Sequence, residues 1–392
     1  MAEQLAPQVS HLLSSSQKVS LRELAAFFLR LGCTAFGGPA AHIAMMEDEL
    51  VRRRQWLSRQ KFLDLLGASN LIPGPSSSEL AIHIGYLLAG WTGLLVAGMC
   101  FILPAAIMVA ALAWAYVRFS KLLAISAILY GVKPVVIAVI LQALWGLGRT
   151  AVKTTFLGVV GVVCVPLAFL GLHPLLVLTL GGCAVCLMSL GTSRSAFSAI
   201  PLATAPAAAL AGAATSFSLG TLFLVFLKIG AIIFGSGYVL LAFLQADLVA
   251  HRGWLTDSQL VDAVAVGQFT PGPVFTTATF IGYILGGMRG AIVATVGIFL
   301  PAFVLVAVSG PLVPRIRKSR IASAFLDGVN VASLALMAAV SWQLGRAALV
   351  DVVTVALAVV ASIALLRYRV NSAWLVLVGA IVGVAWNVFR LC

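Results

Sequence analysis

Long apolar segments separated by short polar stretches recur along nearly the whole chain. In the first half, four such segments lie near 92–117, 122–148, 154–170 and 174–190. Each segment is close to or above the roughly 20 residues that a helix needs to cross a bilayer. The pattern therefore predicts an all-α polytopic membrane protein.

The chain contains the same unit twice. The stretch NLIPGPSSSELAIHIGYLLAGWTG around residue 73 returns as QFTPGPVFTTATFIGYILGGMRG around residue 271. The other aligned positions include Trp56 with Trp254, Asp64 with Asp262, and, after one residue is dropped behind the PGP, Pro104 with Pro301. A register that holds over most of both halves indicates a tandem duplication.

The duplication divides the chain into four parts. We expect an N-terminal tail at 1–20, repeat 1 at 21–193, a linker at 194–217 and repeat 2 at 218–392. The linker is rich in Ala, Ser and Pro, a composition typical of segments with little fixed structure.

Each repeat begins with a long helix that is interrupted by glycine. The helices are expected at 22–46, with FGGP at 36–39, and at 218–246, with FGSG at 234–237. Two apolar arms of about 13 residues follow, one on each side of Pro-Gly-Pro. Such an arm rises about 20 Å, too little for a hydrocarbon core of roughly 30 Å. The arms therefore form either a re-entrant hairpin or one helix broken at mid-membrane.

This choice decides how the repeats are related. A re-entrant hairpin leaves five crossings per repeat and inverts the second repeat, whereas a broken spanning helix leaves six and makes the repeats parallel. The loop at 47–61 carries five basic residues, which places it in the cytoplasm and the N-terminus outside. Both topologies distribute the basic residues identically between the two sides, so charge leaves the symmetry open.

Composition supports the membrane assignment. Apolar residues make up 61% of the chain and charged residues 9%, whereas a soluble globular domain has about 25% charged residues. The formal net charge is +13. In such an apolar chain we attribute it to loop Arg and Lys residues at anionic lipid, so the expected partner is the bilayer and not nucleic acid.

These motifs together resemble the chromate ion transporter family. The resemblance rests on FGGP, the acidic-basic stretch after it, Trp-Leu, PGP and IGY-x-x-x-G-x-x-G, and covers essentially all of 20–392. It implies two homologous halves of opposite orientation, about ten transmembrane helices plus two re-entrant PGP hairpins, and a multi-pass protein of the bacterial cytoplasmic (inner) membrane. It also implies efflux of chromate, an oxyanion similar to sulfate, and hence chromate resistance. On that basis we prefer the inverted arrangement.

The PGP tips are the first candidate substrate site. Helix N-termini and hydroxyl donors attract an oxyanion at bilayer depth. Glycine permits a sharp reversal and close approach of a ligand; the alternative is that PGP only turns a hairpin. The candidates are Gly37, Gly38, Pro73, Gly74, Pro75, Ser76, Ser77, Pro271, Gly272, Pro273 and Thr276. Glycines such as Gly85, Gly90 and Gly93 are instead expected to allow close helix packing.

Basic and amide side chains extend this site. Arg30 and Lys228 are equivalent, and each precedes a Phe-Gly break by six residues. Basic residues in a span are functional candidates, with snorkelling to the interface as the alternative. Lys133, whose counterpart is Asn330, lies too deep in its segment for easy snorkelling. Asn70 and Gln268, just before each PGP, are candidate donors to the anion.

Glu79 and His83 are the candidates for proton coupling. They are four residues apart and share one helix face, where a carboxylate and an imidazole could carry a proton. The alternative is that Ser76 and Glu79 form a capping box. Asp64 and Asp262 are expected to be mainly structural. Repeat 2 has no counterpart of Glu79 and reads FGSG for FGGP, so it is expected to serve more as a scaffold.

These observations predict a secondary active transporter, not an enzyme, that exports chromate. The rivals are a carrier of sulfate or another oxyanion, and a membrane-embedded enzyme acting on lipid-linked phosphate, for which Glu79 and His83 are the only candidate pair. The sequence has no Walker loop and no metal-ligand constellation. We therefore expect no ATP-driven transport by this chain alone and no cofactor or metal. Whether the chain forms a homodimer stays open.

Overall fold

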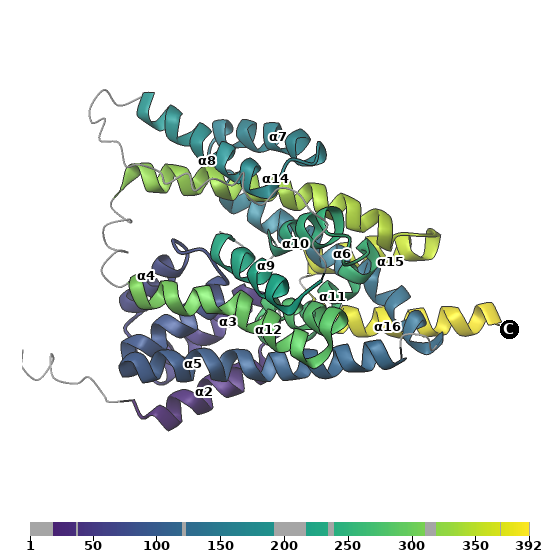
Figure 1. Ribbon diagram of the computed structural model, residues 1–392, viewed down its shortest axis with the longest axis horizontal. Helices are drawn as coiled ribbons and strands as arrows, with labels where there is room; N and C mark the ends of the chain where they lie inside the picture. The colour runs from purple at the N-terminus through teal and green to yellow at the C-terminus, as the bar shows by residue number, and fades with distance from the viewer. Residues whose placement is uncertain are drawn as a thin grey trace, which may run out of the picture.

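The structure, a computed structural model, describes residues 19–36, 38–119, 123–191, 217–233, 239–309, 319–368 and 370–391. Every regular element in these ranges is a helix, and most of the long helices run along the longest axis of the molecule (Figure 1). Gly37, the FGSG segment, and nearly all of the expected tail and linker lie outside the described residues.

Repeat 1 starts with a helix broken at FGGP, as predicted. Its helices are α2 (Leu21–Thr34), α3 (Gly38–Glu47), η1 (Asp48–Arg53), α4 (Arg59–Ser69), α5 (Ser76–Phe119), α6 (Leu123–Ala151), α7 (Thr155–Phe169) and α8 (Pro174–Gly191). Ser20 caps α2 through a capping box with Glu23, and the Ser58 hydroxyl accepts from the Lys61 N–H at the start of α4.

Repeat 2 is built in the same order. Its helices are α9 (Leu219–Ile232), α10 (Leu240–Leu244), η4 (Gln245–His251), α11 (Asp257–Phe269), η5 (Val274–Thr276), α12 (Thr277–Ser309), α14 (Arg320–Ala348), α15 (Val352–Tyr368) and α16 (Ser372–Leu391). Ser218 and Thr256 cap α9 and α11 at the positions where Ser20 and Ser58 cap α2 and α4. The duplication therefore extends to the local signals that start helices.

Helix α5 contains a sharp reversal. Ala89 and Gly90 are non-helical, with Gly90 at φ 62°. A Cβ on Gly85 would clash with the carbonyl oxygen of Gly93, whereas residues eight apart in a straight helix are about 12 Å apart along its axis. Residues 76–88 and 91–119 are therefore two antiparallel helices, the predicted second arm and the span after it.

Helix α12 repeats this hairpin. Its non-helical residues are Gly286 and Gly287, and a Cβ on Gly282 would clash with the carbonyl oxygen of Gly290. The chain also reverses at the PGP tip of this repeat, because a Cβ on Gly267 of α11 would clash with the Thr277 hydroxyl at the start of α12. The two arms of repeat 2 therefore form a re-entrant hairpin, which answers the question that arm length left open.

The direction of the helices follows from glycine contacts. In α6 and α16, Ala127 lies against Gly383, whereas Val135 lies against Gly379. Residue numbers that increase along α6 pair with residue numbers that decrease along α16, so these helices are antiparallel. The same holds for α8 and α14, where Gly182 contacts Phe325 and Cys186 donates to the Ile321 carbonyl.

These contacts make the repeats inverted. Short connections join α6, α7 and α8 in turn, so α7 returns and α8 runs parallel to α6. Because α14 is antiparallel to α8, it is also antiparallel to α6, which is its equivalent in the other repeat. The expectation of oppositely oriented repeats is confirmed by these contacts.

The apolar helices suit a membrane. Among the described residues, five helices are long and apolar enough to cross a bilayer by length and composition: Ser76–Phe119, Ser126–Ala151, Val274–Ser309, Ile321–Ala348 and Ser372–Phe389. Five shorter apolar helices are Thr155–Phe169, Pro174–Ser189, Leu219–Ile232, Leu240–His251 and Val352–Tyr368. Large apolar side chains such as Ile107, Val162 and Leu187 are exposed, as expected for a lipid-facing surface. The predicted all-α polytopic membrane protein is confirmed.

Candidate functional site

The two PGP tips meet at the interface between the repeats. The Gly74 N–H donates to the Ile233 carbonyl at 2.6 Å, and the Gly272 N–H donates to the Ala35 carbonyl at 2.9 Å. Ala35 and Ile233 are equivalent residues that end α2 and α9. Each tip therefore binds the open carbonyl end of the other repeat's first helix, where carbonyls lack an intrahelical partner.

Both tip glycines have positive φ and are packed against protein. Gly74 has φ +144°, and a Cβ there would clash with the Glu79 carboxylate. Gly272 has φ +89°, and its Cβ would lie 2.6 Å from the Ala105 Cβ and 3.2 Å from the Gly32 carbonyl oxygen. The turns need glycine, as predicted. On the side where a Cβ would lie, each glycine is in contact with protein, so that side leaves no room for an anion.

The other tip residues differ between the repeats. Pro271, Gly272, Pro273 and Thr276 are all buried, and the Thr276 hydroxyl donates to the Pro273 carbonyl at 2.8 Å. In repeat 1, by contrast, Pro73 and Ser76 keep part of their surface while Gly74 and Pro75 are buried. Gly38 begins α3 with φ 73°. The first tip is therefore the less enclosed of the two.

Glu79 is completely buried one turn into the second arm of repeat 1. Within the described part of the chain, neither carboxylate oxygen has a hydrogen-bond partner. The capping-box alternative is therefore wrong for Glu79, whose carboxylate lies against Gly74 instead. His83 is 7% exposed and its Nε2 is also buried without a partner, as is the Ser78 hydroxyl. Three polar groups on one short arm are thus buried and unsatisfied.

His42 is a buried polar residue that the sequence analysis did not select. Its Nε2 lies 3.2 Å from the Ala35 carbonyl oxygen and its Nδ1 lies 3.3 Å from the Ser77 hydroxyl. Since a carbonyl only accepts, Nε2 donates, and in the neutral imidazole Nδ1 then accepts from the Ser77 hydroxyl. His42 thus joins the carbonyl that holds the second tip to a hydroxyl of the first. Its counterpart is Leu240, so the repeat alignment gave no signal for it.

The two predicted lysines are paired with carboxylates, and the predicted arginine is exposed. Lys133 forms an ion pair with Asp262 at 3.1 Å and a 2.7 Å hydrogen bond to the Ser258 hydroxyl. Lys228 forms an ion pair with Asp247 at 2.9 Å. Arg30 is exposed, on the face of α2 away from its buried residues. Their roles in substrate binding stay predictions, and both lysines already have carboxylate partners.

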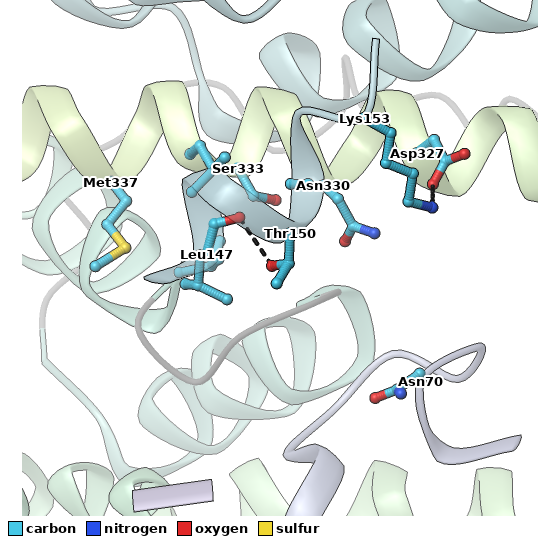
Figure 2. Close-up of a pocket in the computed structure, with 11 residues that line it drawn as sticks. Asn70, Leu147, Thr150, Lys153, Asp327, Asn330, Ser333 and Met337 are labelled. Carbon is cyan, nitrogen blue, oxygen red and sulfur yellow. Dashed lines mark hydrogen bonds and ion pairs between the residues drawn. The ribbon is translucent and has the colours of Figure 1, made fainter. Parts of the chain in front are cut away.

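Asn70 lines a cavity of about 370 Å³ whose walls mix polar and apolar side chains (Figure 2). The opposite wall is formed by α14 and the end of α6, from which Asn330, Ser333 and Thr150 project. The Ser333 hydroxyl is buried without a hydrogen-bond partner. The structure thus brings Asn70 together with residues from the other repeat that sequence reasoning missed. Gln268, its equivalent, is partly buried in α11 and does not line this cavity.

An ion pair lies at one end of this cavity. Lys153 Nζ is 2.7 Å from Asp327 Oδ1, with side-chain exposures of 60% and 26%. The Lys153 side chain is the more exposed of the two. The cavity therefore combines neutral polar side chains, set among apolar ones such as Leu334 and Met337, with a cation at one end.

Comparison with known proteins connects these features to transport. The family model described as "Chromate transporter" matches residues 22–187 and again residues 220–384. A "Probable chromate transport protein" of Synechococcus elongatus is 33% identical over 376 residues, covering 93% of this chain and 95% of the relative. The "Chromate transport protein" of Cupriavidus metallidurans is 34% identical, covering 92% of each chain.

A further relative and the apolar helices agree with these matches. The "Chromate transport protein" of Pseudomonas aeruginosa is 34% identical, covering 84% of this chain and 82% of the relative. No solved structure matches. The family resemblance is confirmed, and together with the apolar spans these bacterial relatives identify a multi-pass inner-membrane protein.

Proposed function

Because the chain belongs to the chromate transporter family, we propose that it is a secondary active transporter that exports chromate in exchange for protons. The observation that carries the coupling is Glu79, a fully buried carboxyl group that has no hydrogen-bond partner among the described residues and lies directly against the first PGP tip. Ionisable groups inside a membrane protein commonly carry protons.

The environment of Glu79 suits a group that gains and loses a proton during the cycle. An ionised carboxylate buried without partners is strongly disfavoured, so a bound proton stabilises the arrangement seen here. Losing that proton requires water, a cation or a rearrangement of the tip. Since Gly74 lies against the carboxylate and its N–H holds Ile233, deprotonation and movement of the tip are expected to be coupled.

His83 extends this proton site along the arm. It lies one turn after Glu79 on the same helix face, and its Nε2 is buried and unpartnered. His83 keeps 7% of its surface exposed, whereas Glu79 keeps none. We infer that His83 passes protons between Glu79 and solvent.

The sign of the substrate's charge supports export. Moving one elementary charge through the membrane potential is worth about 2.3 kcal/mol per 100 mV, so an inside-negative potential favours the exit of a dianion by roughly 4.6 kcal/mol per 100 mV. Proton entry adds to the same driving force. Export of a divalent oxyanion therefore needs no nucleotide.

Uptake of labelled chromate by everted membrane vesicles tests the proposal. We expect uptake to rise when the vesicle lumen is acidified. Glu79→Gln should remove this rise while leaving uptake driven by the membrane potential. Glu23→Gln is the matched control, because glutamine at that position preserves the capping box with Ser20.

Three results would count against parts of the proposal. Wild-type vesicles that take up no chromate under either gradient would reject chromate export. An acid-stimulated rise that survives in Glu79→Gln would reject Glu79 as the coupling group. Inhibition by equimolar sulfate would broaden the substrate to tetrahedral dianions in general.

A further inference from the structure

We propose that the cavity between Asn70 and α14 is the oxyanion-binding site, with Asn70, Asn330 and Ser333 as its neutral donors and Lys153 at its mouth. This inference rests on the proposed transport of a divalent oxyanion. The cavity measures about 370 Å³, within the range of small-ligand pockets and many times the roughly 30 Å³ share of one water molecule. A tetrahedral anion fits with part of its hydration shell.

The chemistry of the lining favours an anion. The amide groups of Asn70 and Asn330 each offer two N–H donors, and they enter the cavity from opposite repeats (Figure 2). The Ser333 hydroxyl is buried and lacks a partner among the described residues. Buried polar groups are normally satisfied by protein, water or ligand, so this hydroxyl indicates a polar occupant of the cavity.

Among the described residues that line the cavity, the one carboxylate is already neutralised. Asp327 forms a 2.7 Å ion pair with Lys153, so this part of the lining carries no free negative charge to attract a cation. An arriving dianion competes with Asp327 for the exposed ammonium and is then passed to the amides and the hydroxyl. Binding by neutral donors with a cation only at the entrance keeps the site weak enough for release, as transport requires.

The inverted repeat provides an internal comparison. At the equivalent positions of α6, Lys133 replaces Asn330 and Val136 replaces Ser333. Lys133 reaches across to Asp262 and Ser258, and Val136 is completely buried. The Lys133–Asp262 ion pair therefore occupies the place in α6 that corresponds to the open cavity beside Asn330 in α14. The binding site belongs to one side of the molecule, beside the first PGP tip.

The test is the half-saturation concentration of chromate uptake in vesicles that contain the full chain, with each variant's membrane content measured in parallel. Asn330→Asp introduces a negative charge at nearly constant shape and should raise the half-saturation concentration at least tenfold. Ser333→Ala removes one neutral hydrogen bond and should raise it about two- to tenfold.

Two matched controls separate local from general effects. Ser341→Ala removes a buried hydroxyl from the same helix, but one that is already bonded to the Met337 carbonyl. Asn371→Asp introduces the same charge at an exposed position where the carboxylate can still accept from the Ala373 N–H. Both controls should keep the wild-type half-saturation concentration.

The outcomes distinguish the site from the function. A wild-type half-saturation concentration in both Asn330→Asp and Ser333→Ala would overturn the cavity as the binding site while leaving chromate transport standing. If Asn330→Asp fails to accumulate, Ser333→Ala, which deletes a single oxygen, decides alone. Absence of saturable uptake in the wild type would instead reject the proposed function itself.

Discussion

At Gly272, the PGP turn meets the backbone of the other repeat. A Cβ there would press on Ala105 and on the Gly32 carbonyl oxygen, and φ is +89°. At Gly74, the obstacle is the far end of the Glu79 side chain, which can rotate away. Two glycines at the same position of the PGP motif should therefore tolerate substitution to different extents. The expectation that repeat 2 serves more as a scaffold concerns transport and stays a prediction.

We therefore expect Gly272→Ala to destabilise the protein more than Gly74→Ala. A strained backbone conformation costs of order 1–3 kcal/mol, and the contact with Ala105 and Gly32 adds to it at Gly272. The measurement is the thermal unfolding midpoint of the detergent-solubilised protein. Gly146→Ala is the control, since Gly146 lies inside α6 with nothing within 4 Å of a Cβ. Greater damage from Gly74→Ala would contradict this account.

The site residues that sequence analysis found are those that belong to a motif. Asn70 and Glu79 adjoin the PGP, and the structure places Asn70 in the cavity and Glu79 at the tip. His42, Asn330 and Ser333 were missed because nothing near them in the sequence distinguishes them from packing residues. Their significance comes from partners or walls contributed by distant segments, which no local pattern reveals.

At the scale of elements, the hairpins inside α5 and α12 determine where the PGP arms can go. The sequence analysis predicted the second arm and the following span as separate elements, but not the two-residue reversal at Ala89 and Gly90 that joins them. It assigned Gly85, Gly90 and Gly93 to helix packing. Gly85 and Gly93 do lie in such a contact, whereas Gly90 makes the turn, which only its positive φ of 62° reveals.

This division of roles predicts that alanine destabilises both positions, for different reasons. At Gly85 an added Cβ would clash with the carbonyl of Gly93 and force the two helices apart, and overpacking of this kind typically costs about 1–3 kcal/mol. At Gly90 no described atom lies within 4 Å of an added Cβ, but φ 62° with ψ −146° is a backbone conformation nearly restricted to glycine, and such strain costs about 1–3 kcal/mol. Both variants should therefore unfold at a lower midpoint than Gly146→Ala. A wild-type midpoint in Gly90→Ala would contradict the strained turn, and one in Gly85→Ala would contradict the close helix contact.

At the scale of the whole molecule, the sequence reveals two repeats but does not show whether they are inverted or parallel. Register matching identified both repeats, yet basic residues distribute identically in the inverted and parallel topologies. The decision comes from contacts such as Gly131 with Gly379, which join helices from opposite repeats. Because inversion is a property of how the two repeats pack, only the three-dimensional arrangement contains it.

Inversion makes a direct prediction about the two sides of the membrane. Arg53 and His251 are equivalent residues, both exposed, in the polar segment that follows the first helix of each repeat. With the Arg-rich 47–61 loop in the cytoplasm, Arg53→Cys should react with a membrane-impermeant thiol reagent only in everted vesicles, and His251→Cys only in intact cells. The measurement requires a background in which native cysteines are replaced, because Cys33 is exposed. If both positions react from the same side, the repeats do not lie inverted across the bilayer. The comparison between the open cavity at Asn330 and its closed counterpart at Lys133, which assumes that the repeats are inverted, would then no longer hold.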